Sequence, residues 1–128
     1  MHSGELTVPK LGAFNSQLHV SIKNLHRGVV DHEGNEVTIL YLPCTKMAVD
    51  GEDVYWAMQL DDSDADAALD HHIAVNVLKL GEHLFAHYAH NCSSNLVRCP
   101  LTKHNFMKCF MAALRQAGVM EVFMSHCF

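Results

Sequence analysis

Histidine is the residue type with the greatest chemical potential in this sequence, because the 128 residues include eleven of them. If residues 63–90 form a single helix, four of these histidines share one flank of it: His72, His83, His87 and His90. Asn76 lies on the same flank. His83 and His87 are four residues apart, and His87 and His90 are three apart. Those separations let two imidazoles reach one tetrahedral ion.

Three interpretations of this histidine flank stay open. The first is a metal site, in which His83, His87, His90 and the thiolate of Cys92 hold zinc. The second is a boundary between the helix and a neighbouring surface, where an amphipathic imidazole packs well. The third is a catalytic histidine. No established metal signature such as His-Glu-x-x-His occurs, so we expect no cofactor, with zinc as the alternative.

Signatures of the common enzyme classes are missing from the sequence. There is no Gly-x-Ser-x-Gly motif and no glycine-rich phosphate loop. The acidic stretch that begins at Asp62 resembles the start of a calcium loop, but Ala67 and Ile73 stand where glycine and glutamate are required. These absences favour a protein that is not an enzyme.

Aromatic side chains give a second candidate site. Trp56 and Tyr55 lie within the strand predicted at residues 54–58, and Tyr88 lies beside His87 on the predicted long helix. These four residues are large enough to line a ligand pocket between the sheet and the helices. The alternative is that they form part of the ordinary apolar core.

Charge and cysteine usage restrict the compartment and the partners. The net charge is −5, and the nine lysines and arginines are scattered singly, so we expect neither nucleic-acid binding nor docking on an anionic membrane. The five cysteines are an odd number without a Cys-x-x-Cys pair, which favours reduced, mostly buried thiols. No secretory signal or long apolar span is evident, so we expect a soluble cytoplasmic protein.

The first sixty residues predict an antiparallel meander. Residues 1–15 lack a clear period and indicate an N-terminal arm, and residues 17–60 contain four or so strand signals. Residues 17–23 alternate between apolar and polar, residues 28–30 and 37–42 flank a Gly34-Asn35 turn, and residues 47–49 and 54–58 flank Asp50-Gly51.

The second half of the chain has a helical period. Residues 63–90 predict one long helix, with a stripe at Ile73, Val77, Leu80, Leu84 and Tyr88. Thr102 is a candidate cap for a second helix over residues 102–117, and Gly118 can end it. Residues 119–124 predict a last strand.

Together these elements predict a single α+β domain covering residues 1–128. Its antiparallel sheet of four to five strands, the N-terminal meander plus the C-terminal strand, is covered on one face by two helices. The uncovered face leads us to expect a homodimer. We expect a small accessory protein that acts through a protein–protein surface; the alternatives are a small-ligand-binding domain or minor enzyme, and a metal-binding protein.

Overall fold

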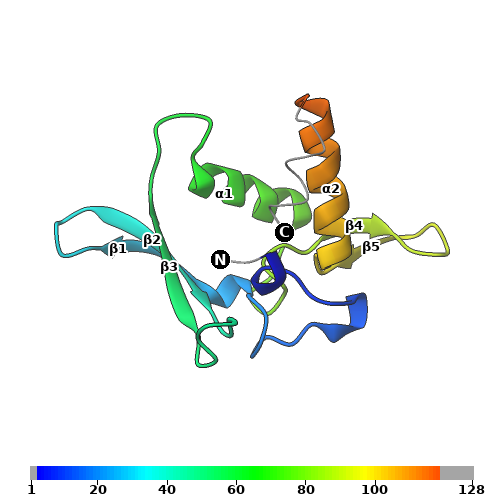
Figure 1. The fold of residues 1–128 in the computed structure, drawn as a ribbon, viewed down its shortest axis with the longest axis horizontal. Helices are drawn as coiled ribbons and strands as arrows, with labels where there is room; N and C mark the ends of the chain where they lie inside the picture. Colours follow the sequence, from blue (N-terminus) through cyan, green and yellow to red (C-terminus); the bar gives the residue numbers. More distant parts are fainter. Residues whose placement is uncertain (1–2, 119–128) are drawn as a thin grey trace.

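Two antiparallel sheets and two helices make up the part of the chain that this computed structural model describes, residues 3–118 (Figure 1). In chain order the elements are η1 (Ser3–Glu5), η2 (Leu11–Ala13), η3 (Ile22–Asn24), β1 (Leu25–Val30), β2 (Glu36–Leu42), β3 (Glu52–Ala57), α1 (Ala65–Asn76), β4 (His87–His90), β5 (Leu96–Cys99) and α2 (Lys103–Gln116). The predicted α+β class is confirmed. No helix within these residues is long and apolar enough to cross a membrane.

The prediction of a single sheet of four to five strands covered by two helices is not confirmed. Strands β1, β2 and β3 form one sheet in that order, and β4 and β5 form a separate hairpin (Figure 1). The predicted last strand at 119–124 lies outside the described residues. Helix α1 packs on the three-stranded sheet, whereas α2 lies beside η1 and has no buried side chain.

Alternation along β2 creates the core. Thr38, Leu40 and Leu42 are buried, and the residues between them are only partly covered. Leu40 lies opposite Val54 of β3, so the two side chains share the inner face of the sheet. The core consists of Val20, Leu40, Leu42, Leu69 and Leu84, drawn from the N-terminal segment, β2, α1 and the chain after α1.

The N-terminal segment is anchored more firmly than an arm would be. Thr7 and Val8 are buried, and Val8 forms a parallel bridge with Thr102 at the start of α2. The amide of Val8 donates to the carbonyl of Leu101 at 2.9 Å, and the amide of Lys103 donates to the carbonyl of Val8 at 3.1 Å. These bonds connect the beginning of the chain to its last described helix.

The strand predicted at residues 17–23 is wrong. The backbone amide of Ser21 donates to Oδ1 of Asn24 at 2.8 Å, and this capping box turns the chain into η3 instead of extending it. Leu18, which the alternation placed on a buried face, is exposed. Only Ser21 keeps a sheet-like contact, an isolated antiparallel bridge to His83.

The predicted hairpin across Asp50-Gly51 is half right. Residues 52–57 do form β3, but they pair with β2, and residues 47–49 belong to the connecting loop. Thr45 holds this loop, because its hydroxyl accepts from the amide of Ala48 at 2.9 Å. Gly51 has φ +92°, and a Cβ there would overlap the ring of Tyr41.

The long helix predicted at residues 63–90 is also wrong, because α1 ends at Asn76. Val77 adopts the left-handed conformation, with φ 51° and ψ 49°, which a β-branched residue rarely does. Residues 87–90 then alternate as β4 and pair with β5. The residues of the predicted apolar stripe therefore lie in three different elements: a helix, a loop and a strand.

Arg98 of β5 stabilises this helix end. Its Nη1 donates to the carbonyl oxygens of Asn76 and Val77 at 3.3 and 2.9 Å. Its Nε donates to Oε1 of Glu82 at 2.9 Å, and its guanidinium lies 5.8 Å from the ring centroid of Tyr88. A cation at the negative end of the helix dipole takes the place of a terminating glycine.

The second helix is confirmed, with its predicted bounds of 102–117 shifted only at the ends. The hydroxyl of Thr102 accepts from the amide of Asn105 at 3.2 Å and caps the first turn. Gly118 follows the last turn with φ +76°. The prediction of mostly buried thiols is wrong for the cysteines within residues 3–118, because none of the four is buried: Cys44, Cys92, Cys99 and Cys109.

Arg98→Gln tests the helix-end contacts. We expect it to lower the free energy of unfolding by more than the loss of an exposed ion pair would, because two carbonyl groups and the partly buried Glu82 lose a charged donor. Arg27→Gln is the matched control, since Arg27 also pairs with carboxylates but at a more exposed position. It should cost less than about 1 kcal/mol. Equal losses in urea denaturation would contradict the role assigned to Arg98.

Candidate binding groove

An apolar hollow of about 480 Å³ lies between the inner face of the sheet and α1. We call it the α1 groove. It is lined by Leu6, Leu40, Val54, Trp56, Ala65, Ala68, Leu69, His72, Leu84 and Phe85. Its floor therefore comes from β2 and β3, one wall from α1, and one end from the N-terminal segment and the chain after α1.

Small side chains on α1 keep the groove open. Leu69 packs into the core, but Ala65 and Ala68 also face the sheet and are too short to fill the space above Val54 and Trp56. Alanine favours the helix while leaving this room. The hollow therefore exists because alternate residues of β3 face α1 and because the α1 residues opposite them are small.

Trp56 places an unpaired hydrogen-bond donor in this apolar setting. Its indole Nε1 is buried and has no hydrogen-bond partner among the described residues. Most buried polar groups in folded proteins are paired, so an unpaired N–H at a groove wall is a candidate point of contact for an acceptor on a bound molecule.

Carboxylates flank the groove in the chain. Glu52 and Asp53 begin β3, and Asp61, Asp62 and Asp64 lie in the connection that leads into α1. None of these five forms an ion pair within residues 3–118. Negative charge therefore lies on both sides of the β3 groove residues in the sequence, which favours a bound molecule that carries positive charge.

His72 closes one side of the groove in its neutral form. Its Nε2 lies 3.2 Å from the carbonyl oxygen of Leu84, and its Nδ1 lies 3.2 Å from the amide nitrogen of Asn76. Because the amide nitrogen can only donate, Nδ1 accepts and Nε2 carries the proton. Burial lowers the pKa of His72, and the nearby His87 acts in the same direction, against the bond to Leu84.

The buried Asn76 connects this imidazole to β4. Its Nδ2 donates to the carbonyl of His72 at 2.9 Å, and its Oδ1 accepts from the amide of Tyr88 at 3.1 Å. Both ends of the amide are used, so the side chain fixes the orientation of α1 relative to the hairpin.

The four predicted pocket residues do not share one site. Trp56 lines the α1 groove, whereas Tyr55 is exposed on the opposite face of β3. Tyr88 packs beside Arg98. His87 lines an adjacent hollow of about 510 Å³ against α2, and this hollow shares His72 and Phe85 with the α1 groove.

The predicted metal ligands His83, His87, His90 and Cys92 are spread over a loop, a strand and a turn. His83 is buried, while His90 and Cys92 are exposed, and Nδ1 of His90 lies 3.2 Å from the carbonyl oxygen of Ser94. Within residues 3–118, no three histidine, cysteine or acidic side chains are grouped so that they could hold an ion.

Three of the predicted histidines, His72, His83 and His87, nevertheless lie near one another, although they belong to different elements and not to one helix. His72 on α1 and His87 on β4 both influence the pKa of His83 in the loop between them, and His19 of the N-terminal segment joins them. The ring centroids of His72 and His83 lie 6.0 and 6.2 Å from that of Phe85.

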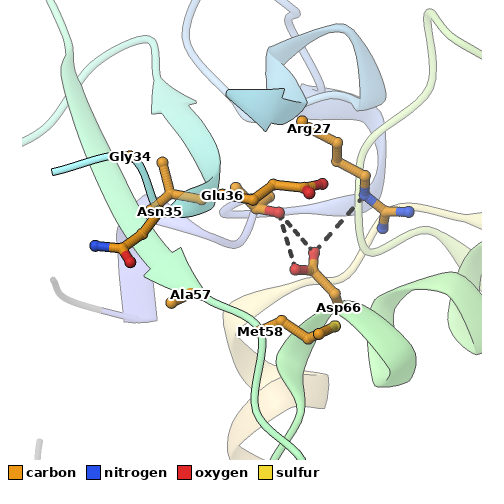
Figure 2. A pocket seen from close by; sticks show the side chains of 10 residues that line it. Arg27, Gly34, Asn35, Glu36, Ala57, Met58 and Asp66 are labelled. Atoms are coloured by element: carbon orange, nitrogen blue, oxygen red, sulfur yellow. Dashed lines mark hydrogen bonds and ion pairs between the residues drawn. The ribbon is translucent and has the colours of Figure 1, made fainter. Parts of the chain in front are cut away.

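A larger hollow of about 610 Å³ lies beside β1, β2 and the first turn of α1 (Figure 2). Asp66 is its central charge. It accepts from the hydroxyl of Thr38 at 2.9 and 3.0 Å and lies 3.7 Å from Nε of Arg27, which also pairs with Asp70. Because these polar groups bind one another, the α1 groove is the stronger candidate site.

Leu6, Ala68 and Leu84 are groove residues that the sequence did not indicate as such. Leu6 lies in the predicted arm, Ala68 and Leu84 in the predicted long helix. The alanines at 65 and 68 were the available signal, since small residues on the inner side of a helix beside a strand can leave space for a ligand. Comparison with protein-family models, with curated proteins and with solved structures found no match.

Asn76→Asp tests the contact between α1 and β4. We expect a loss of roughly 2–3 kcal/mol at pH 7, because the carboxylate is buried and lacks the N–H that donates to His72. The pKa of His72, followed by NMR, should rise beside the new charge. Asn91→Asp is the control, since Oδ1 of Asn91 accepts from the amides of Ser93 and Asn95 and aspartate can replace it. If both variants are equally stable, the role of Asn76 is contradicted.

Proposed function

We propose that the protein is an accessory binding domain that recognises another protein through its apolar surface. The observation that carries this proposal is the distribution of apolar residues. Within residues 3–118 only seven apolar side chains are buried, while fourteen large ones are exposed. A chain that leaves this much apolar surface uncovered, together with an apolar groove, is suited to binding another protein.

The α1 groove fits an extended apolar segment with basic residues at its ends. Strand β3 lies at the edge of its sheet, so a segment beside it can add backbone hydrogen bonds. Alternate side chains of such a segment would enter the groove above Val54 and Trp56. A backbone carbonyl supplies the acceptor that the indole of Trp56 lacks, and basic ends complement the flanking carboxylates.

A defined peptide tests this proposal. The probe has alternating valine and threonine between terminal lysines, and Trp56, the single tryptophan, reports its binding through fluorescence. We expect a blue shift of emission as the indole loses water. A peptide with glutamates in place of the lysines should bind about tenfold more weakly at low salt, because the groove is flanked by carboxylates.

Two variants of α1 locate the binding. Ala68→Glu puts a longer, polar side chain at the groove wall, where it obstructs the apolar part of the peptide and would have to be buried, so binding of the lysine-ended peptide should weaken at least about tenfold. Ala74→Arg lies on the other side of the helix and should leave binding unchanged. If neither peptide changes the emission, or if Ala68→Glu binds as well as the unaltered protein, the groove is not the binding site.

The outer face of α1 supports a homodimer. Ala67, His71 and Ala74 recur at four- and three-residue steps on the side away from the core, and all three are exposed. The small side chains of Ala67 and Ala74 let a second helix approach closely on either side of His71. Four further apolar residues at or after the end of the helix are also exposed: Val75, Val77, Leu80 and Tyr88. Two copies packed about a two-fold axis would cover both.

Light scattering tests the assembly. At micromolar concentration we expect twice the chain mass of 14.3 kDa. Ala74→Arg should give the monomer, because two guanidinium groups would meet at the two-fold axis, while Ala68→Glu should remain dimeric. A monomeric unaltered protein, or a dimeric Ala74→Arg variant, would contradict this arrangement.

A small apolar ligand is the second candidate occupant of the α1 groove. The volume of about 480 Å³ and the unpaired indole N–H favour it. A ligand carried through purification would be released on denaturation and detected by mass spectrometry. If the occupant is instead a segment of a partner protein, no small ligand should be released, and the lysine-ended peptide should bind the purified protein directly.

A further inference from the structure

The N-terminal segment holds the two halves of the described structure together. The amide of Leu84 donates to the carbonyl of Val20 at 3.1 Å, and Ser21 forms its bridge with His83. Further towards the N-terminus, Val8 pairs with the backbone before α2. Leu6 of the same segment lines the α1 groove. Any change that loosens this segment therefore changes the groove.

His83 lies at the centre of this contact. It is only 2% exposed, and its ring packs edge-on against Phe14 with centroids 5.5 Å apart. Its Nδ1 accepts from the amide of Phe85 at 3.3 Å, so the proton of the neutral ring is on Nε2. That Nε2 is buried and has no hydrogen-bond partner among the described residues.

The charged groups around His83 do not favour an imidazolium. His19 approaches from the N-terminal segment, His72 from α1 and His87 from β4, and each is itself an imidazole. Glu82 and Arg98 line a small cavity together with His83 and Phe14. Glu82 is already bound to Arg98 and to the amide of Lys79, so its charge is balanced.

We propose that His83 is a pH-sensitive latch: its protonation releases the N-terminal segment from the loop after α1 and thereby opens the α1 groove. The inference deepens the proposed function, because it assigns regulation to the same groove. A proton on Nδ1 would face the amide of Phe85, donor against donor, and the new charge would be buried next to Phe14.

The direction of the pH effect follows from the protonation states. Burial lowers the pKa of His83 to about 4, the imidazoles of His19, His87 and His72 act in the same direction, and the backbone of Leu6 acts against them. In the released state the ring meets water and has an ordinary pKa of about 6.5. The released state therefore binds protons more readily, and the closed state loses stability as the pH falls from 6.5 towards 4. Opening should increase about 20-fold between pH 7 and pH 5.

Amide hydrogen exchange measures the opening without any groove partner. The amides of Val8 and Leu84 are the reporters, because each is bonded across the N-terminal segment. After correction for the pH dependence of intrinsic exchange, their protection should fall about 20-fold between pH 7 and pH 5. Amides paired between β2 and β3 serve as the internal reference and should change much less.

His83→Asn is the decisive variant, because its Oδ1 can accept from the amide of Phe85 but does not titrate. We expect it to remove most of the pH dependence at Val8 and Leu84. His32→Asn, at an exposed position, should retain it. Unchanged pH dependence in His83→Asn would overturn the latch.

If His83→Asn does not fold, NMR titration of His83 in the unaltered protein tests the latch instead. The latch requires that the closed state resist protonation down to about pH 5. Titration near 6.5, with protection unchanged, would overturn it. Binding of the lysine-ended peptide, followed by Trp56 fluorescence at pH 7 and pH 5, is a separate readout. If that peptide never binds, the proposed function fails while the exchange result still tests the latch.

Discussion

The position of α1 depends on a side chain that lies 22 residues after the helix ends, Arg98. By donating to the last helical carbonyls, it allows the helix to stop at a valine in the left-handed conformation and lets the chain turn back towards β4. The same turn brings Asn76 against Tyr88 and His72 against Leu84. The guanidinium thus stabilises the helix end from which the hairpin and one wall of the α1 groove are built.

The parts of the fold that could be predicted from sequence are those with local signals. Gly34 supplies the positive φ of the β1–β2 turn, and Pro43 follows the last residue of β2. Thr102 caps α2, and Gly118 follows it. In each case the residue that sets the backbone conformation lies next to the element that it begins or ends. Alternation alone also places Trp56 on the inner face of β3, where it lines the α1 groove.

The remaining elements could not be predicted because the residues that determine them are either distant in sequence or of a type that does not usually mark a turn. The two hairpin turns have the same design, in which Asp31 and Asn91 each accept two amides of their own turn. The fourth residue has positive φ in both, but it is Gly34 in one and Ser94 in the other, so only the first was recognised as a hairpin. The groove itself depends on a helix end that Arg98 sets from β5.

The pairing of Val8 with Leu101 has a consequence for how the chain folds. Each sheet joins strands that are neighbours in sequence, so both hairpins close short loops. Joining Val8 to Leu101 closes a loop of about 90 residues and costs about 2.5 kcal/mol more in chain entropy than closing a five-residue turn. During synthesis, the residues between Val8 and Leu101 take on the order of 5–20 s to be added, so Val8 cannot form this pairing before then. Throughout that interval the nascent chain exposes Leu6 and Val8, and the groove lacks the end that the N-terminal segment later provides.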